Sequence, residues 1–196
     1  MPDARRDAWT VVVPVKPPTL GKSRLTVPGV DRTALARAIA LDTIEAAAAV
    51  ADVVVISADT SIDVPGVRVM PEPAPRGIAA ALSTVLPGLP EERRAVLLGD
   101  LPGLESSDLD EALTLAESVR LGAVPDDERE GTTLVTAREG ELPAAFGPSS
   151  WRRHLAAGFV ELPVRPESTL RRDVDRPEHL VGRLGPRTRA VLRRRR

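Results

Sequence analysis

The residues of this sequence that could carry chemistry are charged side chains placed after short apolar runs. Of the 27 lysine and arginine residues only Lys16 and Lys22 are lysines, and both lie in one stretch near the N-terminus, close to Arg24. Two ammonium groups and a guanidinium beside a glycine suit a polyphosphate, because lysine is a mobile point charge and arginine a planar fork. The glycine spacing is not that of a Walker A loop, and a solvated loop is the alternative interpretation.

Carboxylates occupy two further positions of this kind. Asp100 follows the apolar run 95–98, where a carboxylate is well placed to hold Mg²⁺, although an aspartate that starts a turn is common. Asp173 and Asp175 project to the same side of an extended chain. They form either surface ion pairs with the arginines around them or a second set of ligands for the same cation. Whether Asp175 joins Asp173 in binding a metal is left open.

Two small, polar segments are candidates for anion binding. Residues 131–133 (GTT) and 146–150 (FGPSS) combine amides and hydroxyls that could hold an anion, or they are ordinary turns. His154 and His179 show no Ser-His-Asp order and no metal-ligand spacing, so we interpret both as ordinary helix residues.

Composition excludes several classes of protein. The 196 residues carry a net charge of −1, which argues against a general nucleic-acid binder, and the two tryptophans and two phenylalanines are too few for base-stacking platforms. Without cysteine there is no disulfide, thiolate zinc site or cysteine nucleophile. No apolar run approaches the ~20 residues of a membrane helix, and no signal region opens the sequence. We expect a cytoplasmic protein that binds neither nucleic acid nor membrane.

The elements that must position these residues alternate between strand and helix. Apolar runs predict strands at 9–15, 53–56, 67–70 and 95–98, and helices are expected at 31–49 (with Asp31 as N-cap), 78–86 and 107–120 (opened by a capping box, Ser107-x-x-Asp110). This order favours an α/β doubly wound architecture, a mostly parallel sheet with helices on both faces. Such sheets bind ligands beyond the carboxyl ends of their strands, where Lys16 and Asp100 are expected.

The rest of the chain is expected to extend this sheet over the site. Strands are predicted at 123–125, 132–136 and 159–162, with helices at 149–157 and from residue 186 onward. We therefore expect one domain spanning residues 1–196, ending in a mobile basic tail at 193–196.

Six segments taken together resemble one family. In chain order they read VVPVKPPTLGKSRL, VVVISAD, LLGDLPGL, VPDDEREGTT, FGPSSWRRH and LRRDVDRPEHL, and they span about residues 11 to 179. This pattern is similar to that of the phosphoenolpyruvate and 2-phospho-L-lactate guanylyltransferases of coenzyme F-420 biosynthesis. Those enzymes are relatives of the molybdenum-cofactor guanylyltransferase and the cytidylyltransferases. The resemblance implies a single-domain, Rossmann-like fold of the GT-A-like type.

The resemblance also implies an activity and a role for each matching residue. The activity is transfer of GMP from GTP to phosphoenolpyruvate, giving enolpyruvyl-diphospho-5'-guanosine and pyrophosphate, with 2-phospho-L-lactate or a molybdopterin-type acceptor as alternatives. The arginine- and alanine-rich composition suggests a GC-rich bacterial genome, and bacterial members are associated with phosphoenolpyruvate. The implied roles are contact with the triphosphate for Lys16, Lys22 and Arg24, Mg²⁺ binding for Asp100 and Asp173, and contact with the phosphorylated acid for Thr132, Gly147 and Ser150.

The sequence departs from the family pattern in two places. It has Gly77-Ile78-Ala79 where relatives often have Gly-Leu-Asn, so any contact of that asparagine with base or ribose is missing or supplied elsewhere. The glycine-threonine segment is shortened, which leaves the choice between Thr132 and Thr133 open. The Ala-rich helix and the low aromatic content leave room for a homodimer interface.

Overall fold

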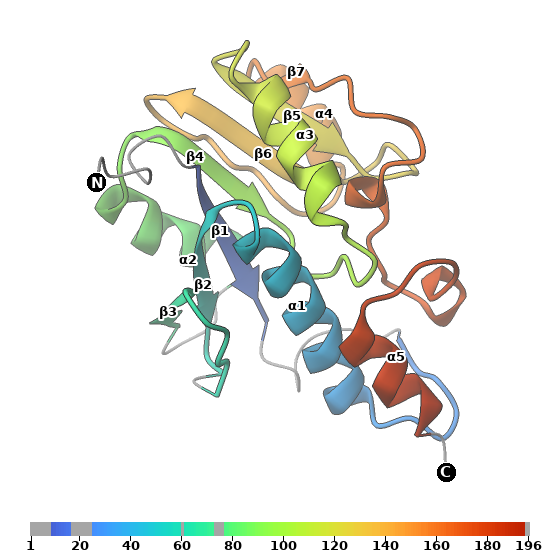
Figure 1. Ribbon diagram of the computed structural model, residues 1–196. Coiled ribbons are helices and arrows are strands. Elements are labelled where there is room, and N and C mark those ends of the chain that lie inside the picture. The colour runs from blue at the N-terminus through green and yellow to red at the C-terminus, as the bar shows by residue number, and fades with distance from the viewer. Residues whose placement is uncertain (1–8, 17–24, 60, 73–76, 195–196) are drawn as a thin grey trace.

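The computed structural model describes residues 9–16, 25–59, 61–72 and 77–194, and within them it shows a seven-stranded sheet with helices on both faces (Figure 1). The sheet order is β3-β2-β1-β4-β6-β5-β7. The strands are β1 (Thr10–Val15), β2 (Asp52–Ser57), β3 (Arg68–Pro71), β4 (Glu92–Leu97), β5 (Leu121–Pro125), β6 (Thr132–Glu139) and β7 (Val160–Glu161). The helices are α1 (Arg32–Ala48), α2 (Ile78–Val85), α3 (Ser106–Ala116), α4 (Ser150–Ala156) and α5 (Pro186–Arg193).

The order of the strands creates the place where a ligand can bind. The chain builds outward from β1 through β2 to β3 and then returns to the other side of β1 with β4, which pairs with β1 in parallel. The carboxyl ends of β1 and β4 therefore lie side by side at a topological switch point, where open α/β sheets bind ligands. Lys16 directly follows β1, and Asp100 lies shortly after β4.

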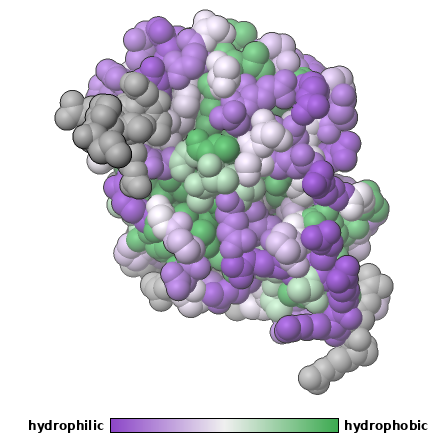
Figure 2. All heavy atoms as spheres, in the orientation of Figure 1, coloured by the Kyte–Doolittle hydropathy of each residue, from purple (hydrophilic) through white to green (hydrophobic). Residues whose placement is uncertain are grey.

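The predicted architecture is confirmed, and its two apolar layers explain the continuous apolar strands. Val11 and Val13 of β1 pack with α1 and α3 on one face, while Val12 packs with α2 and α4 on the other. A strand buried on both faces reads as an unbroken apolar run rather than an alternating one. The face of the molecule drawn in Figure 2 is mainly hydrophilic. No helix in the described part of the chain is long and apolar enough to cross a membrane.

Strand β6 is the one described strand that runs against the others. It follows β5 through the turn 126–131 and inserts between β4 and β5. Because β6 is antiparallel to both neighbours, its first residue, Thr132, lies at the edge of the sheet where β4 and β5 end. The reversal thus brings a segment from the second half of the chain to the switch-point side.

The two predicted helix starts have different outcomes. Asp31 caps α1 as expected, because its carboxylate accepts hydrogen bonds from the backbone N–H groups of Thr33 and Ala34 at 2.8 and 3.2 Å. The capping box at Ser107 is wrong: α3 begins at Ser106, after Glu105, without a side-chain cap. The backbone N–H of Glu105 instead donates to the Thr169 hydroxyl at 2.9 Å, so this helix end is satisfied by the C-terminal segment.

Helix α5 lies beside α1 and is fastened to it by one buried carboxylate (Figure 1). Asp42 of α1 accepts hydrogen bonds from the backbone N–H groups of Arg187 and Thr188 at 3.0 and 2.8 Å. The first amides of a helix have no partner inside it, so Asp42 caps α5 from outside. The arginine run expected as a tail begins at Arg193, the last residue of α5, and positions 195–196 lie outside the described residues.

We predict that Asp42→Ala lowers the free energy of unfolding by about 2 kcal/mol, because two amides at the start of α5, one of them buried, lose their acceptor. Urea denaturation followed by circular dichroism measures this loss. Asp52→Ala, at an exposed position, is the matched control and should change stability by less than about 0.5 kcal/mol. Equal losses in the two variants would contradict the capping role.

Candidate active site

A pocket of about 1070 Å³ opens at the switch point, at the upper end of the range for small-molecule sites. Its walls come from the chain after β1 and after β4, the β5–β6 turn, the loop before α4 and the segment that follows β7. It gathers every predicted site residue that the structure describes, namely Lys16, Asp100, Thr132, Gly147, Ser150 and Asp173. The other two predicted residues, Lys22 and Arg24, lie outside the described residues.

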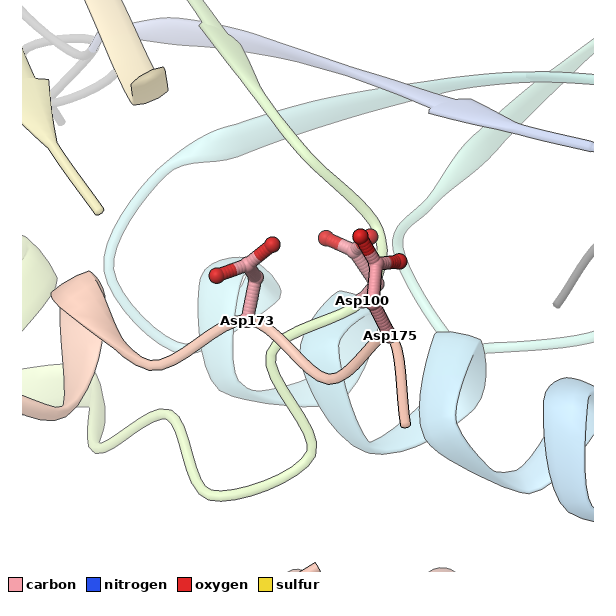
Figure 3. A group of neighbouring side chains, drawn as sticks. All are labelled: Asp100, Asp173 and Asp175. Atoms are coloured by element: carbon pink, nitrogen blue, oxygen red, sulfur yellow. The ribbon is translucent and has the colours of Figure 1, made fainter. Parts of the chain in front are cut away.

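Three carboxylates converge on one side of this pocket (Figure 3). Asp100, Asp173 and Asp175 each offer an oxygen within 4.8 Å of the others. The backbone N–H of Val174 donates to the carbonyl oxygen of Asp100 at 3.0 Å, and the Val174 side chain is buried among apolar residues that include Leu35. With Val174 turned inward, the aspartates on either side of it share the opposite side of the chain, as their spacing predicted. Asp175 therefore belongs to the cluster.

The loop that carries Asp100 is held by a residue the sequence did not single out. The hydroxyl of Thr43, buried in α1, accepts a hydrogen bond from the backbone N–H of Leu101 at 3.1 Å and donates to the carbonyl of Ile39 at 3.0 Å. Nothing in the sequence marks this threonine, because its role depends on how closely α1 approaches the loop after β4.

The segment that carries Asp173 is held by a second unpredicted residue, Asp108 of α3. Its buried carboxylate accepts hydrogen bonds from the backbone N–H and the hydroxyl of Thr169 at 2.7 and 2.6 Å, and from Arg165 at 2.7 Å. Burial raises the pKa of Asp108, but these hydrogen bonds and the charge of Arg165 outweigh burial and lower the pKa below its ordinary value. Asp108 is therefore a charged anchor for the chain leading to the aspartates.

The arginines before Asp173 pair with the hairpin turn. Arg171 and Arg172 lie 3.3 and 3.7 Å from the carboxylate of Asp127, and the backbone N–H of Asp127 donates to the carbonyl of Arg171 at 3.0 Å. These two arginines therefore pair with a carboxylate of the β5–β6 turn. Their pairing joins the carboxylate side of the pocket to the β5–β6 turn.

The β5–β6 turn is closed by Asp126, which accepts hydrogen bonds from the backbone N–H groups of Glu130 and Gly131 at 3.0 and 2.6 Å. A Cβ atom at position 131 would lie 2.4 Å from the Asp126 carboxylate, so a larger residue there would displace the carboxylate that closes the turn. The glycine-threonine segment is therefore a tight turn that delivers Thr132 to the pocket.

The loop before α4 meets this turn. Gly147 has a φ of 121°, a conformation that favours glycine, and its carbonyl accepts the backbone N–H of Ser150 at 3.0 Å. The backbone N–H of Trp151 donates to the carbonyl of Glu130 at 3.2 Å, which ties α4 to the hairpin turn. Thr132, Gly147 and Ser150 thus lie on joined segments of the pocket wall.

His154 of α4, which we interpreted as an ordinary helix residue, is fully buried and hydrogen-bonded at both ring nitrogens. Its Nδ1 lies 2.9 Å from the hydroxyl of Thr132, and its Nε2 accepts the backbone N–H of Ala145 at 2.8 Å. Burial, assisted by the charge of Arg153, lowers the pKa of His154 to about 4. Nothing in the sequence indicates that His154 contacts Thr132 and Ala145, because a lone histidine on a short helix is usually structural.

We predict that stability falls by about 3 kcal/mol as the pH is lowered from 6.5 to 4 because of His154. The unfolded chain takes up this proton near pH 6.5, whereas the folded chain resists it down to about 4, so protonation favours unfolding across that window. Urea denaturation at pH 7, 5.5 and 4.5 measures the effect. His154→Gln should remove most of it, while Arg152→Lys, an exposed change in α4, should keep it. If the free energy of unfolding depended on pH in the same way in all three proteins, the buried neutral state of His154 would be contradicted.

Comparisons with known proteins show the family and the fold to which the chain is similar. The family model described as guanylyl transferase CofC like matches residues 9–159. The chain is 38% identical to a phosphoenolpyruvate guanylyltransferase of Thermomonospora curvata, over 95% of this chain and 89% of the relative. It is 39% identical to the enzyme of that name from Streptomyces coelicolor, over 95% and 96% of the two chains. A hypothetical transferase from Thermus thermophilus has the same fold, with a TM-score of 0.56 and 18% identity over 89% of this chain and 100% of that one. This chain therefore belongs to the guanylyl transferase CofC-like family.

Proposed function

We propose that this protein transfers GMP from GTP to phosphoenolpyruvate, giving enolpyruvyl-diphospho-5'-guanosine and pyrophosphate, as a step of coenzyme F-420 biosynthesis. The observation that carries the proposal is the meeting, in one pocket, of a carboxylate cluster and the turns around Thr132 and Gly147. Relatives of 38 and 39% identity that bear the name phosphoenolpyruvate guanylyltransferase support the choice of substrates.

The proposed reaction is a displacement at phosphorus that needs no general base. An oxygen of the acceptor phosphate attacks the α-phosphorus of GTP, the bond from that phosphorus to the bridging oxygen breaks, and pyrophosphate leaves with the electron pair. A phosphate monoester has a second pKa of ~6 and is mostly dianionic at neutral pH, so no proton must be removed. Catalysis then rests on positioning and charge neutralisation. The described histidines fit this scheme: His154 is bonded at both nitrogens, and His179 accepts the backbone N–H of Asp175.

We propose Mg²⁺ as the cofactor of this reaction. Asp100, Asp173 and Asp175 supply hard carboxylate oxygens, which Mg²⁺ prefers, and acidic side chains outnumber basic ones among the described residues of the pocket wall. A triphosphate entering such an acidic pocket requires a cation. When bound, Mg²⁺ supplies charge neutralisation at the phosphate oxygens. Asp100 and Asp173 would hold it, with Asp175 as a third carboxylate.

The remaining roles follow from position in the pocket. Lys16, exposed at the carboxyl end of β1, would contact the triphosphate, and we extend that role to Lys22 and Arg24 from the family pattern. Thr132, the Gly147 backbone and Ser150 would bind the phosphorylated acid at the wall formed by the β5–β6 turn and the loop before α4. This arrangement would set the acceptor phosphate and the α-phosphorus side by side in the pocket.

Pyrophosphate release tests the proposed activity, with GTP as donor and phosphoenolpyruvate or 2-phospho-L-lactate as acceptor. We expect phosphoenolpyruvate to support the faster release. Asp100→Asn should lower the rate at least about a hundredfold, because a cation ligand is lost. Glu128→Gln, at an exposed position on the pocket wall, is the matched control and should retain activity. Pyrophosphate release with 2-phospho-L-lactate alone would identify that acid as the acceptor substrate instead. Pyrophosphate release with neither acid would refute the proposal.

Electron paramagnetic resonance of Mn²⁺ tests the proposed cation site independently of turnover. In the presence of GTP, Asp173→Asn and Asp175→Asn should each weaken Mn²⁺ binding about tenfold or more, since each removes a charged oxygen ligand. Glu178→Gln, another carboxylate of the pocket wall outside the cluster, should leave the affinity unchanged. If Glu178→Gln weakens binding as much as Asp173→Asn, general charge rather than the cluster holds the cation.

A further inference from the structure

The hydroxyl of Thr132 occupies an unusual position at the start of β6. Between β5 and β6 the register shifts, so that Leu134 pairs with Val124 while Thr132 pairs with Pro125, and Thr133 is the extra residue. A bulge of this kind redirects the side chains beyond it. The shift places Thr132 on the face of the sheet covered by α4, and its side chain reaches His154.

The same register shift separates the two threonines between which the sequence left the choice open. The hydroxyl of Thr133 donates to the carbonyl of Val124 at 3.4 Å, inside the hairpin. Both threonines line the pocket, and the hydroxyl of Thr132 contacts His154 at 2.9 Å. Because the proton of the Thr133 hydroxyl is used inside the hairpin, Thr132 is the threonine that we assign to ligand contact.

The hydrogen bonds of His154 determine which ring nitrogen carries the proton. The backbone N–H of Ala145 can only donate, so Nε2 must accept and carries a lone pair. A neutral imidazole has one donor and one acceptor, which leaves the proton on Nδ1, facing the oxygen of Thr132. Nδ1–H therefore donates to Thr132, and Thr132 accepts.

The surroundings of His154 keep this arrangement neutral. Both phenylalanines of the sequence lie edge-on to the imidazole, Phe146 at 5.3 Å and Phe159 at 5.1 Å between ring centroids. Burial in this apolar cage lowers the pKa of His154 to about 4, well below neutral pH. Protonation of Nε2 would turn this nitrogen from an acceptor into a donor and break its hydrogen bond with the Ala145 amide. The low pKa excludes this protonation at neutral pH.

We infer that His154 is a positioning residue that makes the Thr132 hydroxyl a hydrogen-bond donor into the pocket. Within the described part of the chain, His154 is the partner of this hydroxyl, and the hydroxyl accepts from it, so its own proton is left for a ligand. A fixed hydrogen-bond donor selects an oxygen that carries no proton. In the acceptor substrate this is a carboxylate or phosphate oxygen. Because His154 also holds the Ala145 amide, it couples this donor to the loop that carries Gly147. The assignment of the acceptor rests on the proposed function.

Two substitutions separate the two bonds of His154. His154→Gln places an oxygen near Nε2, keeping an acceptor for Ala145 and losing the donor to Thr132. His154→Asn places an amide N–H near Nδ1 and keeps that donor. We expect His154→Gln to raise the KM for phosphoenolpyruvate about tenfold while the KM for GTP is unchanged. The KM for phosphoenolpyruvate should be lower in His154→Asn than in His154→Gln, because the donor to Thr132 is kept. Arg152→Lys should have the same KM as the wild type.

A double-mutant cycle shows whether His154 acts through Thr132. Thr132→Val removes the hydroxyl at nearly constant volume and should raise the same KM about tenfold or more. Adding His154→Gln to Thr132→Val should then cause no further rise, because the group it orients is gone. Effects that multiply in the double variant, or an equal rise in the KM for GTP, would overturn the inference.

The tautomer is tested without turnover by nitrogen-15 NMR of histidine-labelled wild-type protein. We expect a neutral ring protonated at Nδ1 at pH 7; protonation at Nε2, or at both nitrogens, would overturn the inference. If the wild type used neither phosphorylated acid, the proposed function would fail, and the NMR result would decide the role of His154 by itself.

Discussion

The carboxylate cluster of the candidate active site depends on one backbone hydrogen bond, from the N–H of Val174 to the carbonyl of Asp100. It joins the loop after β4 to a segment far along the chain and brings three carboxylates within 4.8 Å of one another. Like charges at that distance oppose each other, so the rest of the fold must hold them together. Thr43 fastens one segment through Leu101, Asp108 fastens the other through Thr169, and the buried Val174 side chain sets the direction in which the aspartates point. A bound cation would relieve this repulsion and could at the same time attract a triphosphate, which is why we regard the cluster as a binding site.

The reversal of β6 supplies the other half of the pocket. A purely parallel extension of the sheet would place the first residue of that strand at the edge remote from Asp100. Running antiparallel between β4 and β5, β6 brings Thr132 to the switch point, and the register shift beside Pro125 turns its side chain toward His154. The fold therefore brings the turns around Thr132 and Gly147 into the same pocket as the carboxylate cluster, and in the proposed reaction the acceptor and the nucleotide meet there.

Local sequence signals predicted the parts of this structure that depend on local forces. The apolar runs at β1 and β4, the Asp31 cap and the shared side of Asp173 and Asp175 follow from burial, capping and backbone geometry within a few residues. The capping box at Ser107 failed because the start of α3 bonds to Thr169, a tertiary partner that no local rule contains. The roles of Thr43, Asp108 and His154 were missed for the same reason. Each acts on a residue distant in the chain, and its residue type alone is common in helices.

The most direct measurement of the central claim is a crystal structure with GTP, phosphoenolpyruvate and Mn²⁺, in which anomalous scattering locates the metal. The account predicts a manganese peak bound by Asp100 and Asp173, with the triphosphate beside it and the acceptor against Thr132. A metal bound away from these aspartates, or a nucleotide outside the pocket at the switch point, would contradict it.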